Sequence, residues 1–115
     1  MILKAQIAGI AIHAVGNRST KRCRQSLVSL TNLAVCRGEI ERVGADAILT
    51  IFSDLEYLIE ELVELQEYTS DWDEPVTDED VDLELGWMYT IFDWELARAF
   101  AKKTTNLRYE NGLAA

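Results

Sequence analysis

The stretch from Ala45 to Tyr68 restricts the fold more than any other part of this 115-residue chain. Its apolar side chains recur every three or four residues with acidic side chains between them, which is the period of an α-helix with one buried face. At 1.5 Å of rise per residue, this helix would be about 35 Å long. The apolar face comprises Ile48, Ile51, Phe52, Leu55, Leu58, Ile59, Leu62, Val63 and Leu65.

Two shorter segments precede this helix. Residues 2–15 are rich in Ala and Ile and fit either a helix or a strand, but their length and alanine content favour a helix. Residues 20–36 show a helical apolar stripe, and Ser19 is positioned to cap that helix at its N-terminus. Gly38 and Gly44 are expected to bracket a short break before the long helix.

A last helix is predicted from about Asp78 to Thr104. Thr77 and Asp80 have the spacing of a capping box, and acidic residues suit the positive end of the helix dipole. Two apolar stripes indicate a helix that is either central in its own bundle or in contact with a partner, and we favour the central position. One stripe contains Leu85, Met88, Tyr89, Phe92, Leu96 and Phe100, and the other contains Leu83, Trp87, Ile91 and Trp94.

These segments predict an all-α fold, a single-domain bundle of about four helices. One Pro and six Gly leave few helix breaks in the whole chain. The bundle is expected to occupy residues 1–104, and residues 105–115 are expected to form a polar C-terminal tail.

The charge is strongly segregated along the chain. Residues 1–44 carry seven basic and two acidic residues, a net of +5, whereas residues 45–115 carry four basic and 18 acidic residues, a net of −14. Seventeen acidic residues and no basic one lie between Arg42 and Arg98. Because a protein that holds phosphate needs a positive surface, this balance argues against direct nucleic-acid binding and favours a basic partner.

Cysteine and histidine content is low. Cys23 and Cys36 are expected to lie about 20 Å apart on one helix, reduced and mostly buried, in a cytoplasmic protein. Together with His13 they match no zinc spacing. The N-terminal apolar run is too short and too interrupted to span a bilayer, so no membrane association is expected. With one His in the chain, no nucleophilic triad and no catalytic residue is predicted.

One carboxylate pattern has metal-binding potential. Glu61 and Glu64 lie one turn apart, and Glu84 begins a Glu-Leu-Gly-Trp run on the next helix. Over residues 55–100 this pattern resembles the MazG-like all-α nucleoside triphosphate pyrophosphohydrolases, which carry an ExxE pair followed by an ExxD pair. The resemblance implies that these three glutamates hold magnesium. The last acid of the family pattern falls on Trp87, which cannot bind a metal.

The acidic composition also resembles that of phage-encoded inhibitors that imitate DNA, such as anti-restriction and anti-CRISPR proteins. This resemblance implies a cofactor-free, non-catalytic protein that inhibits or modulates a basic, nucleic-acid-handling partner through steered association. A small adaptor subunit that binds through its Trp-rich helix, or a homodimer, remains an open alternative. The expected partner-binding residues are Asp54, Glu56, Glu60, Glu64, Glu67, Asp71, Trp72, Asp73, Glu74, Trp87 and Trp94.

Overall fold

The computed structural model of the chain describes the backbone of residues 2–114 and the side chains of residues 2–101. It contains four helices, α1 (Ile2–Asn17), α2 (Cys23–Cys36), α3 (Arg42–Tyr68) and α4 (Asp78–Ala114), and no strand within residues 2–114. The predicted all-α bundle is therefore confirmed, and residues 2–15 are helical. The predicted end of the last helix at Thr104 is wrong, because the backbone of α4 stays helical to Ala114. The side chains of residues 102–115 lie outside the described part, and the assignment of residues 105–115 to a polar tail outside the bundle stays a prediction.

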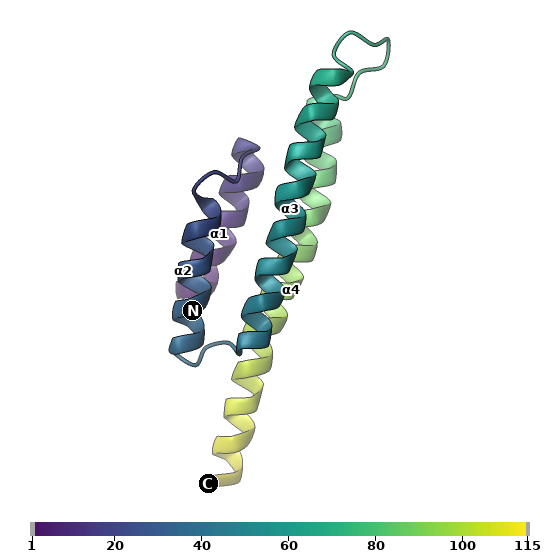
Figure 1. The fold of residues 1–115 in the computed structure, drawn as a ribbon. Coiled ribbons are helices and arrows are strands. Elements are labelled where there is room, and N and C mark those ends of the chain that lie inside the picture. The colour runs from purple at the N-terminus through teal and green to yellow at the C-terminus, as the bar shows by residue number, and fades with distance from the viewer. Residues whose placement is uncertain (1, 115) are drawn as a thin grey trace.

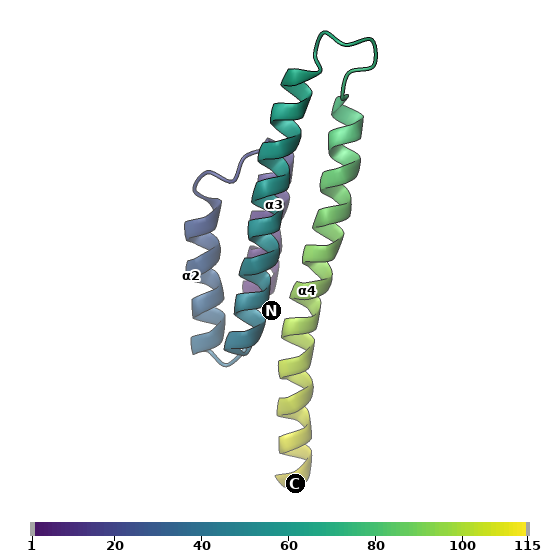
Figure 2. The same ribbon diagram turned by 45° about the vertical axis from the view of Figure 1, so that its right-hand side comes forward.

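The helices run alternately up and down, and each packs against the next along the chain (Figure 1). Helix α4 packs against both α3 and α1, which closes the four helices into a ring. Helices α3 and α4 are the long pair, and their upper ends stand beyond α1 and α2 (Figure 2). The molecule is consequently an elongated rod of 67 × 22 × 20 Å.

The core lies where all four helices meet. Phe52 of α3 and Phe92 of α4 are fully buried and meet edge to face, with ring centroids 6.3 Å apart. The apolar stripe predicted for α3 supplies much of this core, because Ile48, Phe52 and Leu55 are completely buried. The other buried apolar residues come from every helix and from Ile40 of the turn between α2 and α3, and those on the helices include Leu3, Ile7, Leu27, Ile59, Val81, Leu85, Leu96 and Phe100.

The turn between α2 and α3 differs from the predicted one. Helix α2 ends at Cys36, and Gly38 adopts a left-handed conformation with φ of 73°, which lets the next amides bond back to the last turn of the helix. The break covers residues 37–41 only, because Gly44 already lies inside α3. A Cβ on Gly44 would lie 3.1 Å from the Cβ of Ala99, so this glycine permits the close approach of α3 and α4.

The start of α2 and the cysteines also correct the sequence interpretation. Ser19 does not cap α2: the capping position is Arg22, in a left-handed conformation without a side-chain cap, and the Ser19 hydroxyl accepts a hydrogen bond from the amide of Lys21. Both cysteines are reduced, but only Cys23 is buried and Cys36 is exposed. The stripe that fixes the face of α2 includes the first cysteine and leaves the second outside it.

The predicted central position of α4 is wrong. Its first stripe is buried, but Leu83, Trp87 and Trp94 of the second stripe are 74%, 68% and 71% exposed. Four helices arranged in a ring bury one face of each helix, so the opposite face of α4 stays in solvent.

Among residues 2–101, no helix is long and apolar enough to cross a membrane.

Candidate interaction surface

The acidic residues of α3 form a row along its exposed side. Glu60, Glu64 and Glu67 are exposed and follow one another at intervals of four and three residues. Side chains at these intervals lie on one face of a helix, about 5–6 Å apart at Cβ. Asp54 is also exposed, nearer the middle of α3, but at six residues before Glu60 it lies about 120° around the helix from this row.

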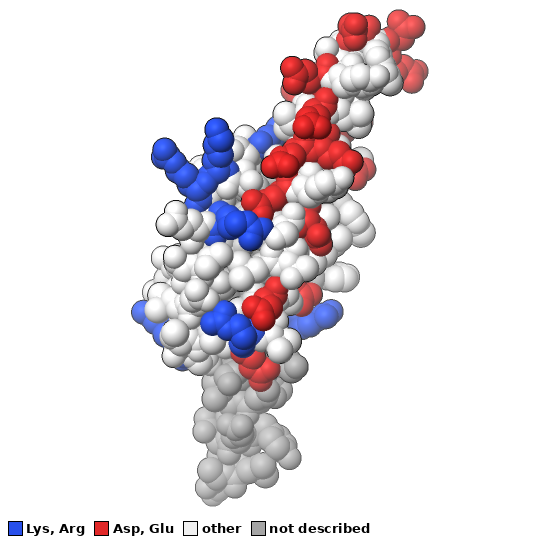
Figure 3. Space-filling model, viewed as in Figure 1, with Lys and Arg blue, Asp and Glu red and all other residues white. Residues whose placement is uncertain are grey.

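The connector between α3 and α4 continues this acidic row. Asp71, Asp73 and Glu74 are exposed on residues 69–77, at the end of the molecule where α3 and α4 stand alone. In the space-filling view, acidic side chains follow α3 to this end, while the basic side chains gather mainly over α1 and α2 (Figure 3). The acidic surface is defined here as Asp54, Glu60, Glu64, Glu67, Asp71, Asp73 and Glu74.

No ion pair reaches the acidic surface from any side chain within residues 2–101. The basic half of the sequence therefore offsets other carboxylates. Arg24 of α2 pairs with Glu56 and lies over the ring of Phe52, 5.9 Å from its centroid. Glu56, which the sequence placed among the partner-binding residues, is thus half-buried in a pair within the bundle.

Arg18 is the residue that sequence reasoning missed. It lies in the turn after α1 with φ of 52°, and its guanidinium donates hydrogen bonds to Asp78 Oδ1 and Asp82 Oδ1, each at 3.0 Å. Gln66 of α3 also donates to Asp78 Oδ1, at 2.6 Å. The hydrogen bond from Gln66, followed by that from Arg18, lowers the pKa of the Asp78 carboxyl. No sequence period connects a turn residue to a helix start 60 positions later, so only the fold reveals this network.

The connector is an ordered turn. The amide of Val76 donates to Thr69 Oγ1 at 2.9 Å across the loop, and Thr69 itself is 2% exposed. Trp72 is 54% exposed and meets Tyr68 edge to face, with centroids 5.5 Å apart. The connector therefore presents its carboxylates and an aromatic side chain from a fixed backbone.

The capping box predicted at the start of α4 is confirmed. The amide of Asp80 donates to Thr77 Oγ1 at 3.1 Å, and the amide of Thr77 donates to Asp80 Oδ2 at 3.0 Å. Hydrogen bonding from Thr77 lowers the pKa of the Asp80 carboxyl, because the bond favours its ionised form. Asp80 is therefore part of the helix cap.

The three glutamates of the pyrophosphohydrolase pattern are all exposed. Glu61 and Glu64 line a shallow hollow on α3 together with Leu62, Leu65 and Tyr68, and Glu84 of α4 does not line it. Within residues 2–101, no group of three or more His, Cys, Asp and Glu side chains is placed to hold a metal ion.

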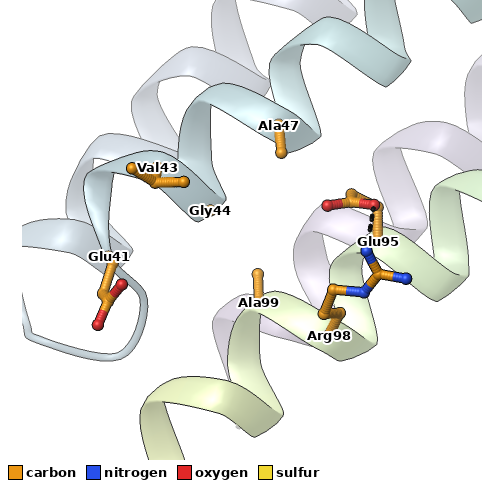
Figure 4. Close-up of a pocket in the computed structure, with 7 residues that line it drawn as sticks. All are labelled: Glu41, Val43, Gly44, Ala47, Glu95, Arg98 and Ala99. Atoms are coloured by element: carbon orange, nitrogen blue, oxygen red, sulfur yellow. Dashed lines mark ion pairs between the residues drawn. The ribbon is translucent and has the colours of Figure 1, made fainter.

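A small apolar pocket lies at the opposite end of α3 (Figure 4). Gly44 and Ala47 of α3 and Ala99 of α4 line it, and an ion pair of 3.9 Å between Arg98 and Glu95 borders it. None of its lining residues belongs to the predicted site.

In comparisons with known proteins, no protein-family model, curated protein or solved structure matches the chain.

Proposed function

We propose that this chain is a non-catalytic acidic binding protein that inhibits or modulates a basic, nucleic-acid-handling protein in the manner of a DNA mimic. The observation that carries the proposal is the acidic surface, seven exposed carboxylates that no cation within residues 2–101 neutralises. A groove that holds nucleic acid is lined with Lys and Arg, and a row of carboxylates offers it the same sign of charge as phosphates.

The arrangement of the surface supports this proposal further. The arginines that contact α3 and α4 bond to carboxylates outside the acidic surface, Arg18 to Asp78 and Asp82 and Arg24 to Glu56. Arg18 and Lys21 line a shallow hollow with Glu60 and Glu64, but no ion pair joins them to these two glutamates. Trp72 stands among the connector carboxylates as an aromatic contact, and aromatic side chains often carry much of the energy of an interface. The surface lies on a helix and an ordered turn, so binding requires little ordering of the backbone.

The test begins by capturing binding proteins from extract of the source cells at low and high salt. A basic nucleic-acid-binding protein that is retained at low salt and lost at high salt is the expected partner, since steered association falls steeply with ionic strength. The purified partner is then bound to labelled DNA or RNA, and unlabelled chain is added. Displacement of the nucleic acid is expected, and an unchanged complex would contradict mimicry.

Two variants with equal net charge make this test specific. Glu60→Lys with Glu64→Lys reverses two carboxylates of the acidic surface, whereas Asp46→Lys with Asp93→Lys reverses two exposed carboxylates outside it. We expect the first pair to weaken partner binding by at least about 30-fold, or 2 kcal/mol, and the second pair to change it only slightly. Equal effects of the two pairs would show that net charge, and not this surface, governs binding.

A further inference from the structure

The solvent-facing side of α4 carries a regular apolar stripe that the bundle does not use. Its members alternate in spacing between four and three residues, which is the a/d pattern of a helix that packs along a second helix. This stripe is distinct from the buried one, and the two Trp side chains within it are 68% and 71% exposed. The outer stripe comprises Leu83, Trp87, Thr90, Trp94, Ala97 and Ala101.

We propose that the outer stripe is a homodimer seam, on which α4 of a second copy of this chain packs in the antiparallel direction. Large residues occupy the first half of the stripe and small ones the second, with Trp94 and Thr90 at the centre. An antiparallel partner, with its two-fold axis at position 92, sets every large side chain opposite a small one. The resulting layers are Trp87 with Ala97, Trp94 with Thr90, and Leu83 with Ala101.

A parallel pair would not have this complementarity. It would place Trp87 against Trp87 and Trp94 against Trp94, while Ala97 and Ala101 would meet only themselves. The Trp layers would then hold the helices apart, and the layers of Ala97 and Ala101 would be left unfilled, so close packing would fail. The order of side-chain sizes along the stripe therefore selects the antiparallel arrangement.

On the side of the stripe that carries Ile91, the charged residues favour the same arrangement, whereas on the other side the exposed Asp93 lies beside its own counterpart. In this register Glu84 of one copy lies beside Arg98 of the other, and the two-fold axis makes this pair occur twice. Glu84 is exposed, and Arg98 is 71% exposed with only a 3.9 Å contact to Glu95 of its own helix. A second copy thus supplies the opposite charge at both ends of the described stripe.

The Trp side chains supply much of the area that a specific interface needs. Four Trp side chains in a dimer can bury on the order of 600 Å², and two copies of Leu83 and the flanking pairs add to this. Specific interfaces begin at about 1,000 Å² in total, so the four Trp side chains supply more than half of the required area and the remaining residues of the seam must supply the rest. No residue of the acidic surface belongs to the outer stripe, so the dimer does not depend on the carboxylates that carry the proposed function.

Sedimentation of the full chain tests the dimer directly. We expect a species with twice the 13.0 kDa mass of the chain, and a monomer for the variant Trp87→Ala with Trp94→Ala, whose dissociation constant rises by at least about 30-fold. The matched control, Tyr57→Ala with Trp72→Ala, also removes two exposed aromatic side chains and remains a dimer. Circular dichroism checks that both variants are folded.

Charge reversal and crosslinking test the direction and the register. Glu84→Lys or Arg98→Glu alone weakens the dimer, and the two together restore it, which a merely structural role would not produce. In a Cys36→Ser background, Ile91→Cys lies beside its own counterpart across the antiparallel seam and forms a disulfide on oxidation. Thr90→Cys self-pairs only in a parallel dimer and stays reduced.

Two results would overturn the proposal. A monomer at every concentration up to about 1 mM would leave the outer stripe to another protein, as in an adaptor, and would not affect the proposed binding of a basic partner. A dimer that persists in the Trp87→Ala with Trp94→Ala variant would place the interface on another face.

Discussion

The two ends of the α3–α4 hairpin differ in burial and in charge. At the base, residues 45–59 and 85–100 pack against α1 and α2, and Phe52 and Phe92 are completely buried. At the tip, residues 67–77, Thr69 is the only buried residue, and four acidic residues occur with no basic one. Most of the apolar burial that stabilises the fold therefore lies at the base. The tip can carry several like charges without weakening the core.

Arg18 marks the boundary between these two regions. Its bonds to Gln66, Asp78 and Asp82 fasten the turn after α1 to both hairpin helices just below the tip. Beyond this point α3 and α4 have only each other and the connector. The contrast teaches that a small domain can separate the surface that binds from the core that folds, provided that its longest helices extend past the bundle.

Replacing an aromatic residue at the base of the hairpin should have the largest effect on the free energy of unfolding. Phe92→Ala removes the edge-to-face contact with Phe52 and leaves a cavity among four helices, so we expect the free energy of unfolding to fall by about 3–5 kcal/mol. Urea denaturation followed by circular dichroism measures this loss. Tyr57→Ala, at a position that is 65% exposed, should cost less than about 0.5 kcal/mol. Similar losses for both would refute a core centred on this pair.

Thr69 provides the strongest stabilisation expected within the tip. Thr69→Val keeps the side-chain shape but removes the oxygen that accepts the Val76 amide, so we expect a loss of about 1–2 kcal/mol. Thr50→Val is the control, because Thr50 is exposed and its hydroxyl only donates back to Asp46 in the same helix. Amide hydrogen exchange should show faster exchange at Val76 in the first variant alone, and unchanged exchange would contradict the loop-closing role.

The cap at the start of α4 should make a smaller, pH-dependent contribution. The folded state lowers the pKa of Asp80, so its stabilisation is present above the unfolded pKa and is lost as the pH falls through the folded value. Thr77→Ala removes the bonded side chain and should cost about 1 kcal/mol at neutral pH. Unfolding measured between about pH 2 and 6 should vary less with pH in Asp80→Asn. An identical pH profile would count against the cap.

Within the tip, the smallest effect on stability is expected at Trp72. Trp72→Ala removes an exposed ring whose only aromatic contact is Tyr68, so the free energy of unfolding should change by less than about 1 kcal/mol. Under the proposed function, the same substitution should lower affinity for the basic partner by at least about 10-fold. A large loss of stability with unchanged affinity would reverse the assignment of core and binding roles along the hairpin.

Much of the fold could be predicted because it depends on local periodicity. The period of α3, the alanine-rich α1 and the Thr77–Asp80 box each involve residues a few positions apart, and their energetics act within one helix. The prediction that Ser19 caps α2 was wrong, because the residue before this helix is Arg22 in a left-handed conformation and no side chain caps the helix. The exposure of Cys36 was missed because the stripe of a short helix fixes its face only approximately.

The candidate site, like the fold, could be predicted only where it depends on residues close together in the sequence. The cation-free run of carboxylates is a property of the sequence, and helical spacing already placed Glu60, Glu64 and Glu67 on one face. The ion pairs of Arg24 with Glu56, and of Arg18 with Asp78 and Asp82, join residues that are 32 to 64 positions apart in the sequence. The packing of the helices brings these residues together, so no local sequence pattern predicts the pairs.

The sequence by itself determined that this chain forms long amphipathic helices and that its acidic charge is concentrated after residue 44, because both follow from residue order alone. Only the tertiary structure decided which of the two apolar stripes of α4 is buried. Helix periodicity makes both stripes equally suitable for burial, and the choice depends on where α1 and α3 lie around α4. That arrangement leaves Trp87 and Trp94 in solvent, where a second copy of the chain can reach them.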